Sequence, residues 1–135
     1  MKTSSIVILY ILTACVFFAV DMIWLGFAAR GVYKKYLGAF LRPDINWTAA
    51  VIFYLLFVAG ILIFAVFPAL EKASWARAAI LGALFGFFAY AAYDLTNLAT
   101  LKGWPLPIVF IDMAWGTFLC GIVGLAGFWM GSALK

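Results

Sequence analysis

The chain has 135 residues, of which 69% are hydrophobic and 10% charged, and it contains no histidine. Soluble domains are about half apolar and a quarter charged, so this composition excludes an ordinary soluble domain and favours a membrane protein. The net charge of +4 is small and its basic residues are scattered, which excludes a nucleic-acid-binding face. Because histidine is missing and the two cysteines have no zinc-binding spacing, we expect no metal site and no cofactor.

The first apolar stretch begins close to the N-terminus. Lys2, followed by an apolar run that reaches Leu12-Thr13-Ala14-Cys15, resembles a lipoprotein signal sequence. The apolar run continues through Val20, however, beyond the point where such a signal would end. We therefore expect residues 5–28 to form a first membrane helix, with no separate targeting segment.

Three further stretches reach the roughly 20 apolar residues that a membrane-spanning helix needs. They predict helices at about residues 47–69, 77–99 and 107–131, and Asn46 is suited to cap the first of these three. Nothing in the composition marks a domain boundary. The sequence therefore predicts an all-α fold, an integral membrane bundle of four transmembrane helices that forms a single domain over residues 1–135.

The connections between these helices are unequal in length. Residues 29–46 form the long one, and their mix of basic and aromatic residues predicts a short amphipathic helix lying at the headgroups. The basic residues divide four against five between the two sides of the membrane. This small bias leaves the orientation open, with a slight preference for a cytoplasmic long connection.

Small residues recur at four-residue spacing in the third and fourth predicted helices. Gly82 and Gly86 lie on one helix, and Gly116, Cys120 and Gly124 on the other. Such faces allow helix backbones to approach closely in a membrane. We expect them to pack against each other within the chain; a homodimer contact is the alternative.

Asp21, Asp94 and Asp112 fall inside the apolar stretches. A charged carboxylate in the middle of a membrane costs a few kcal/mol, so each should face protein or water rather than lipid. Counted from the helix ends, all three lie roughly 8–12 Å inside the membrane at 1.5 Å per residue. Because the helices alternate in direction, we expect the aspartates to form one layer on the side of the long connection.

Aromatic and polar residues accompany each aspartate at spacings that share a helix face. Trp24 follows Asp21 by three positions, and Trp115 follows Asp112 in the same way. We expect these neighbours to point into one cavity with the aspartates. The predicted lining residues are Trp24, Tyr54, Tyr90, Tyr93, Asn97 and Trp115.

The run Tyr90–Pro105, YAAYDLTNLATLKGWP, resembles the signature of a bacterial membrane family catalogued as domain of unknown function 2177. The resemblance covers essentially the whole chain. It implies a multi-pass protein of the bacterial inner membrane with four helices and no assigned chemistry, and it suggests a role linked to lipids. The other matching segments are Asp21-Met22-Ile23-Trp24-Leu25-Gly26, Phe53-Tyr54, Pro68-Ala69-Leu70 and Asp112 with Trp115-Gly116.

Three functions compete for the predicted aspartate layer. The first is a pocket that binds or modifies a membrane lipid or an isoprenoid-like apolar small molecule. In this pocket Asp94 would be the central group of a cofactor-free acid–base isomerisation, with Asp112 and Asp21 as its partners. The second is a proton-coupled small transporter in which the carboxylates relay protons, and the third is an accessory or scaffold subunit of a membrane complex. The alternative to all three is a polar network that only fixes the register of the helices.

Overall fold

The computed structural model describes the backbone of residues 1–135 and the side chains of all residues except 28 and 29. Four of its helical segments are long and apolar enough to cross a membrane. The predicted all-α architecture with four spans is therefore confirmed, and the observed bounds differ from the predicted ones by only a few residues. These segments are Thr3–Phe27, Trp47–Glu71, Trp75–Thr100 and Leu106–Leu134.

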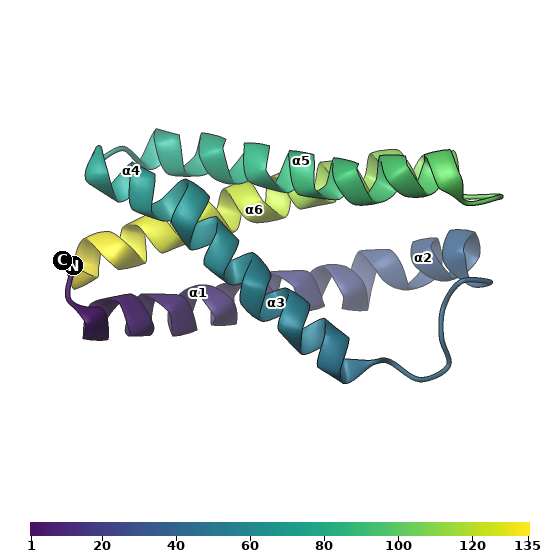
Figure 1. Ribbon diagram of the computed structural model, residues 1–135, viewed down its shortest axis with the longest axis horizontal. Helices are drawn as coiled ribbons and strands as arrows, with labels where there is room; N and C mark the ends of the chain where they lie inside the picture. The colour runs from purple at the N-terminus through teal and green to yellow at the C-terminus, as the bar shows by residue number, and fades with distance from the viewer.

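The first span and the segment after it form one continuous rod (Figure 1). It consists of α1 (Thr3–Ile23), a π-helical turn η1 (Trp24–Ala28) and α2 (Ala29–Leu37). Residues 29–37 are thus helical as predicted, but α2 continues the first helix instead of lying separately across the headgroups. The reason is that no proline interrupts this stretch, and one face of α2 packs against Trp104 and Ile108.

The second span crosses the others obliquely (Figure 1). It runs through α3 (Trp47–Ile61), a second π-helical turn η2 (Leu62–Val66) and α4 (Phe67–Glu71). The side chain of Asn46 accepts a hydrogen bond from the amide of Ala49 at 3.2 Å, which confirms the predicted cap. The π turn lies just before Pro68, whose ring and missing N–H disturb the helical hydrogen bonds of the preceding turn.

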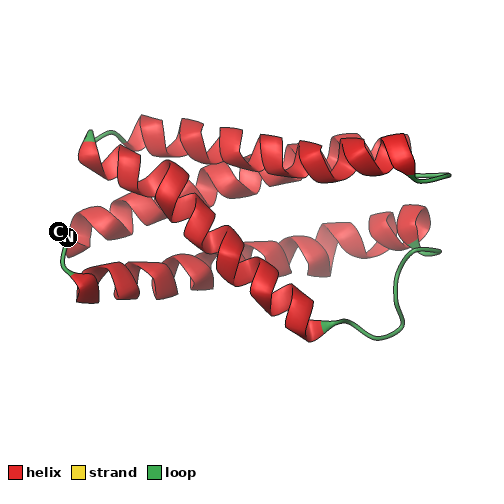
Figure 2. Cartoon of the chain, viewed as in Figure 1, coloured by secondary structure: helices red, strands yellow, loops and turns green.

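The third and fourth spans, α5 (Trp75–Thr100) and α6 (Leu106–Leu134), run side by side in opposite directions (Figures 1 and 2). A Cβ atom added to Gly82 would collide with the carbonyl oxygen of Cys120, and one added to Gly86 with that of Gly116. One added to Gly124 would lie 2.8 Å from the carbonyl oxygen of Ala78. The predicted packing of small residues therefore occurs within the chain.

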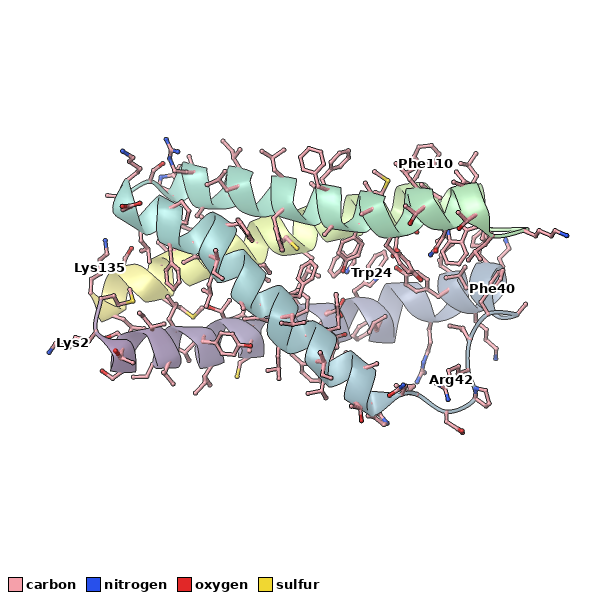
Figure 3. The ribbon with its side chains drawn as sticks, in the orientation of Figure 1. Lys2, Trp24, Phe40, Arg42, Phe110 and Lys135 are labelled. Atoms are coloured by element: carbon pink, nitrogen blue, oxygen red, sulfur yellow. The ribbon has the colours of Figure 1, made fainter. Side chains whose placement is uncertain are left out.

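Two clusters of buried apolar side chains hold the helices together. The larger one fills the middle of the bundle and includes Leu9, Phe17 and Ile61. The smaller one, Leu37 with Trp104, Ile108 and Val109, lies where α2 meets the turn between α5 and α6. Both chain ends lie at the opposite end of the molecule, together with the α4–α5 turn (Figure 2). Charged side chains mark the two ends, with Lys2 and Lys135 at one and Arg42 at the other (Figure 3).

Candidate functional site

The three aspartates of the candidate spans are all buried. Asp94 is 0% exposed, Asp112 7% and Asp21 8%. They come from three different helices, α5, α6 and α1, and they lie towards the end of the bundle that carries α2. Contacts of Trp115, Trp24 and Tyr33 link Asp21 to Asp112. Asp94 lies beside Asp112.

Asp21 is held by donors from two other helices. The Tyr54 hydroxyl on α3 donates to Oδ2 at 2.8 Å, and the Trp115 indole N–H on α6 donates to Oδ1 at 3.3 Å. Both carboxylate oxygens therefore have a partner. Asp21 joins α1 to α3 and α6, which gives it the character of a residue that fixes helix positions.

Trp24 and Trp115 stack on each other at the centre of the site. Their ring centroids are 4.5 Å apart and their planes differ by 9°. Trp24 belongs to the π turn η1 and points into the interior of the bundle (Figure 3). The stack brings together the two Asp-x-x-Trp segments, Asp21–Trp24 and Asp112–Trp115. Trp115 of the second segment also donates a hydrogen bond to Asp21 of the first.

Tyr33 completes the other half of this arrangement. Its hydroxyl donates a short hydrogen bond to Oδ1 of Asp112 and accepts one from the Trp24 indole at 3.4 Å. Burial raises the pKa of the Tyr33 phenol above its usual value, and the hydrogen bond to Asp112 raises it further. The phenol therefore remains a neutral donor. The sequence reasoning missed Tyr33; its signal is the face that it forms with Tyr36 and Leu37, opposite Lys35.

Asp94 differs from the other two aspartates in its partners. Among the described residues, neither of its carboxyl oxygens has a hydrogen-bond partner, although the side chain is fully buried. The Asp112 carboxyl and the Trp104 indole lie close to it, and the Trp104 N–H is also unpartnered in the described part of the chain. Buried polar groups nearly always have a hydrogen-bond partner, so an unpartnered Asp94 carboxyl group beside that of Asp112 is the unusual feature of the site. Trp104 was also missed as a site residue.

The remaining predicted residues lie around this centre at different depths. The Tyr90 ring packs directly over Gly116 and stands edge-on to Phe57 at 6.2 Å. Tyr93 is half exposed and stands edge-on to Trp104 at 5.8 Å. Asn97 lies beside Tyr93, and no described contact joins it to an aspartate.

Two hollows meet at this site. The first, which we call the aromatic groove, lies between α3 and α5 and has a volume of about 590 Å³. The second, the basic hollow, lies between α2 and α5 with a volume of about 680 Å³. Both sizes are typical of ligand-binding pockets, which range from about 300 to 1,000 Å³. The aromatic groove is lined mainly by Phe53, Phe57, Phe85, Tyr90, Tyr93 and Asp112, and the basic hollow mainly by Leu25, Arg30, Tyr33, Lys34, Tyr93 and Asp112.

A larger hollow of about 960 Å³ lies on the outer face of α5 and α6. Its walls are apolar side chains and small residues such as Ala83 and Gly121, with Thr117 as a polar exception. It lacks the convergence of polar groups that marks a ligand site. The candidate site is therefore the smaller pair of hollows that share Asp112.

Residues 6–129 match the family described as "Predicted membrane protein (DUF2177)". No curated protein and no solved structure matches the chain. The family match contains the second and third candidate membrane helices, most of the first and fourth, and all three aspartates of the site. The chain therefore belongs to this family of predicted membrane proteins.

Proposed function

We propose that the protein is a multi-pass protein of the bacterial inner membrane that binds a lipid or an isoprenoid-like apolar molecule in the aromatic groove. The observation that carries the proposal is the composition of this groove, which is lined by five aromatic residues and one buried carboxyl group, that of Asp112. Ligand pockets for apolar molecules typically combine such walls with a few polar groups that orient the ligand.

The groove is accessible from the side of the bundle. Its lining residues Phe53 and Leu56 on α3 are 48% and 68% exposed, so its mouth lies on the outer surface of a candidate span. In a membrane this surface faces the hydrocarbon chains of lipids. A lipid-soluble ligand can therefore enter laterally, without passing through water.

The carboxyl pair suggests the chemistry that such a ligand could undergo. Asp112 belongs to the lining of the groove, whereas Asp94 neighbours Asp112 but is not part of the lining. Asp112 would therefore touch the ligand, and Asp94 would be a positioning residue. This exchanges the roles expected from sequence, where Asp94 was the central group. Asp21 would also position the site, since both of its oxygens are engaged by Tyr54 and Trp115.

A pair of carboxyl groups that retains one proton can serve as both acid and base. Asp112 would donate its proton to one carbon of a double bond, and the resulting carbocation would lie against the aromatic faces of Tyr90 and Tyr93. Return of a proton from the neighbouring carbon to the carboxylate would shift the double bond. The reaction conserves electrons and protons, so it requires no redox partner.

Two features weigh against the competing functions. Proton transport requires polar groups across the whole membrane, but apart from the three aspartates the buried polar side chains of the described residues comprise only Thr13. A scaffold subunit requires a filled polar core, whereas here the Asp112 carboxyl group lines two hollows of ligand size.

The proposal is tested by filling the groove. Ala89 lines it, whereas Ala92 on the same helix is exposed and faces outward. We expect Ala89→Phe to lose a lipid that co-purifies with the wild type, and Ala92→Phe to retain it. Native mass spectrometry with lipidomics measures both. Equal retention by the two variants would rule out the groove as the binding site.

The proposed chemistry has a separate test. Asp112→Asn keeps the shape of the side chain but removes the acid proton, so the bound ligand should remain and its unconverted form should accumulate. Asp44→Asn, which changes an exposed aspartate in the loop, is the matched control. An identical ligand profile in wild type and Asp112→Asn would exclude catalysis by this carboxyl group.

A further inference from the structure

The aromatic groove and the basic hollow share two lining residues, Tyr93 and Asp112. They therefore adjoin at this point, and one extends between α3 and α5 while the other extends along α2. Their walls differ in charge, because Arg30 and Lys34 line the basic hollow and the lining of the aromatic groove includes no basic side chain. A space with one apolar arm and one cationic arm is complementary to an amphiphile with an anionic headgroup.

The cations lie on a face of α2 whose position is fixed. Arg30, Tyr33, Lys34 and Leu37 are spaced as neighbours on one face of a helix, and all four line the basic hollow. The hydrogen bond from Tyr33 to Asp112 fastens this face to α6, and Leu37 packs in the smaller apolar cluster beside Trp104. The two basic side chains therefore line the same hollow as Tyr93 and Asp112, the residues shared with the aromatic groove.

We propose that the ligand is an amphiphile with a phosphate-type anionic headgroup. Arg30 and Lys34 bind the headgroup in the basic hollow, and the chain passes Asp112 into the aromatic groove. A guanidinium group can make paired hydrogen bonds to phosphate oxygens, and an ammonium group adds a point charge. This inference rests on the proposed function, since it names the class of molecule that the groove binds.

The location of Asp112 has a consequence for this ligand. Because Asp112 lines both hollows, it lies at the junction between headgroup and chain. The bonds that it can reach are therefore the ones nearest the headgroup, not those at the far end of the chain. The lining of the basic hollow contains one acidic side chain, Asp112, and two basic ones, Arg30 and Lys34. Oδ1 of Asp112 accepts the hydrogen bond from Tyr33.

Basic residues at a membrane surface also attract anionic lipids without forming a site. Arg42 in the α2–α3 loop and Lys102 in the α5–α6 turn provide the comparison, since both are exposed. The loop and the turn lie at the same end of the molecule (Figure 1). Neither belongs to the lining of the basic hollow. A general surface effect would depend on both pairs of residues equally, whereas a headgroup site depends on Arg30 and Lys34.

The experiment compares three lipids with matched chains: phosphatidylglycerol, phosphatidylcholine and diacylglycerol. Each is offered in equal amounts to wild type, to Arg30→Ala/Lys34→Ala and to Arg42→Ala/Lys102→Ala, and retention is measured by native mass spectrometry. We expect the preference for phosphatidylglycerol over diacylglycerol to fall about 25-fold in the first double variant, since each basic side chain near an anionic headgroup contributes about fivefold. The second double variant should keep the wild-type preference.

Equal preferences in the two double variants would overturn the headgroup assignment. The charge-conserving variant Arg30→Lys/Lys34→Arg should restore the preference, which separates loss of charge from loss of folding. Uptake of diacylglycerol by Ala89→Phe distinguishes the two proposals. If this variant loses diacylglycerol while Arg30→Ala/Lys34→Ala still prefers phosphatidylglycerol, the headgroup assignment fails and the groove remains. If Ala89→Phe takes up diacylglycerol normally, the proposed function itself fails.

Discussion

Asp21 and Asp94 are the same type of residue at similar depth, yet their surroundings give them different roles. Asp21 has a donor on each carboxylate oxygen, whereas the oxygens of Asp94 have none among the described residues. An unpaired buried polar group costs about 1–3 kcal/mol, so pairing of the kind seen at Asp21 is what stability alone would favour. Asp94, beside Asp112 and close to two hollows, is therefore the aspartate for which a structural role is the weaker explanation.

Tyr33 provides a direct test of the network around Asp112. We expect Tyr33→Phe to lower the free energy of unfolding by about 1–2 kcal/mol, because the variant loses the hydrogen bond to Asp112 and leaves a buried acceptor unpaired. Unfolding in detergent, followed by heat or by denaturant, measures the change. Tyr36→Phe is the matched control, since Tyr36 lies one turn away against the same apolar cluster. Equal destabilisation by both variants would contradict the role of this hydrogen bond.

The difference in the free energy of unfolding between wild type and Tyr33→Phe should also depend on pH. The folded state raises the pKa of Tyr33, whereas the unfolded chain titrates near the usual value of about 10. The contribution of the phenol to stability is therefore fully present below about pH 10 and is lost as the pH rises towards the higher folded value. The two proteins should converge above pH 10, and a difference that stays constant would argue against the buried hydrogen bond.

At the scale of residues, the sequence indicated which side chains gather at the candidate site better than it indicated their partners. The aspartates and tryptophans could be picked out because charged and amphipathic residues stand out in apolar runs. Tyr33 and Trp104 were missed because they lie outside those runs, where aromatic residues are common at membrane surfaces. Their roles depend on how α2 packs against the α5–α6 turn, which is a tertiary contact that periodicity does not encode.

At the scale of elements, the π turn η1 explains why α2 presents Tyr33 to the site. Tyr33 follows Asp21 by twelve positions, and in an unbroken α-helix it would point about 120° away from the aspartate. The additional residue of a π turn rotates everything beyond it by about 100°, which brings the two residues onto nearly the same face. A regular helical period therefore could not predict this contact from sequence.

The α5–α6 pair depends on glycines at positions where the backbones meet. We expect Gly86→Ala to destabilise the protein by about 1–3 kcal/mol, because the added methyl group would collide with the carbonyl oxygen of Gly116, which is backbone and cannot rotate away. Gly121→Ala is the matched control on α6, where an added Cβ meets nothing closer than 3.5 Å. Its unfolding midpoint should stay unchanged or rise slightly, because alanine favours the helix. Equal stability of Gly86→Ala and Gly121→Ala would contradict the close approach of Gly86 to the carbonyl oxygen of Gly116.

At the scale of the whole molecule, the two halves of the bundle differ in character. The half that contains both chain ends is filled by apolar side chains such as Leu9 and Ile61, with Thr13 as a buried polar exception. The half that carries α2 contains the aspartates, the stacked tryptophans and the two hollows. This asymmetry agrees with the proposed function, in which the ligand would enter from one leaflet of a membrane.

The four spans were predictable because a run of about 20 apolar residues has few alternatives to a membrane helix. The oblique path of the second span and the extension of the first helix into α2 were not predictable in this way. Both depend on which side chains meet across helices, for example the Tyr10 hydroxyl on α1, which donates to the backbone carbonyl of Leu55 on α3 at 2.6 Å. Hydropathy is nearly uniform along these helices, so it does not specify their mutual angles.

The arrangement of the spans predicts which segments share a side of the membrane. Lys2 and the α4–α5 turn lie at one end of the bundle, and the α2–α3 loop and α5–α6 turn lie at the other. A membrane-impermeant maleimide should therefore label Lys2→Cys and Lys72→Cys from one side, and Arg42→Cys and Lys102→Cys from the other. The same measurement tests the leaflet of the site, because the aspartates lie towards the end that carries Arg42 and Lys102.

Labelling after permeabilisation provides the control for cysteine reactivity, and the natural Cys15 and Cys120 lie within candidate spans, where a water-soluble reagent should react poorly. The side on which Arg42→Cys reacts in intact cells gives the orientation that nine scattered basic residues leave open. If it reacts from the cytoplasmic side, the basic hollow opens towards the leaflet where phospholipids are made.

Reaction of Lys72→Cys and Lys102→Cys from the same side would contradict α5 as a span, because these positions flank that helix. The assignment of Asp94 to a membrane-embedded site would then fail with it.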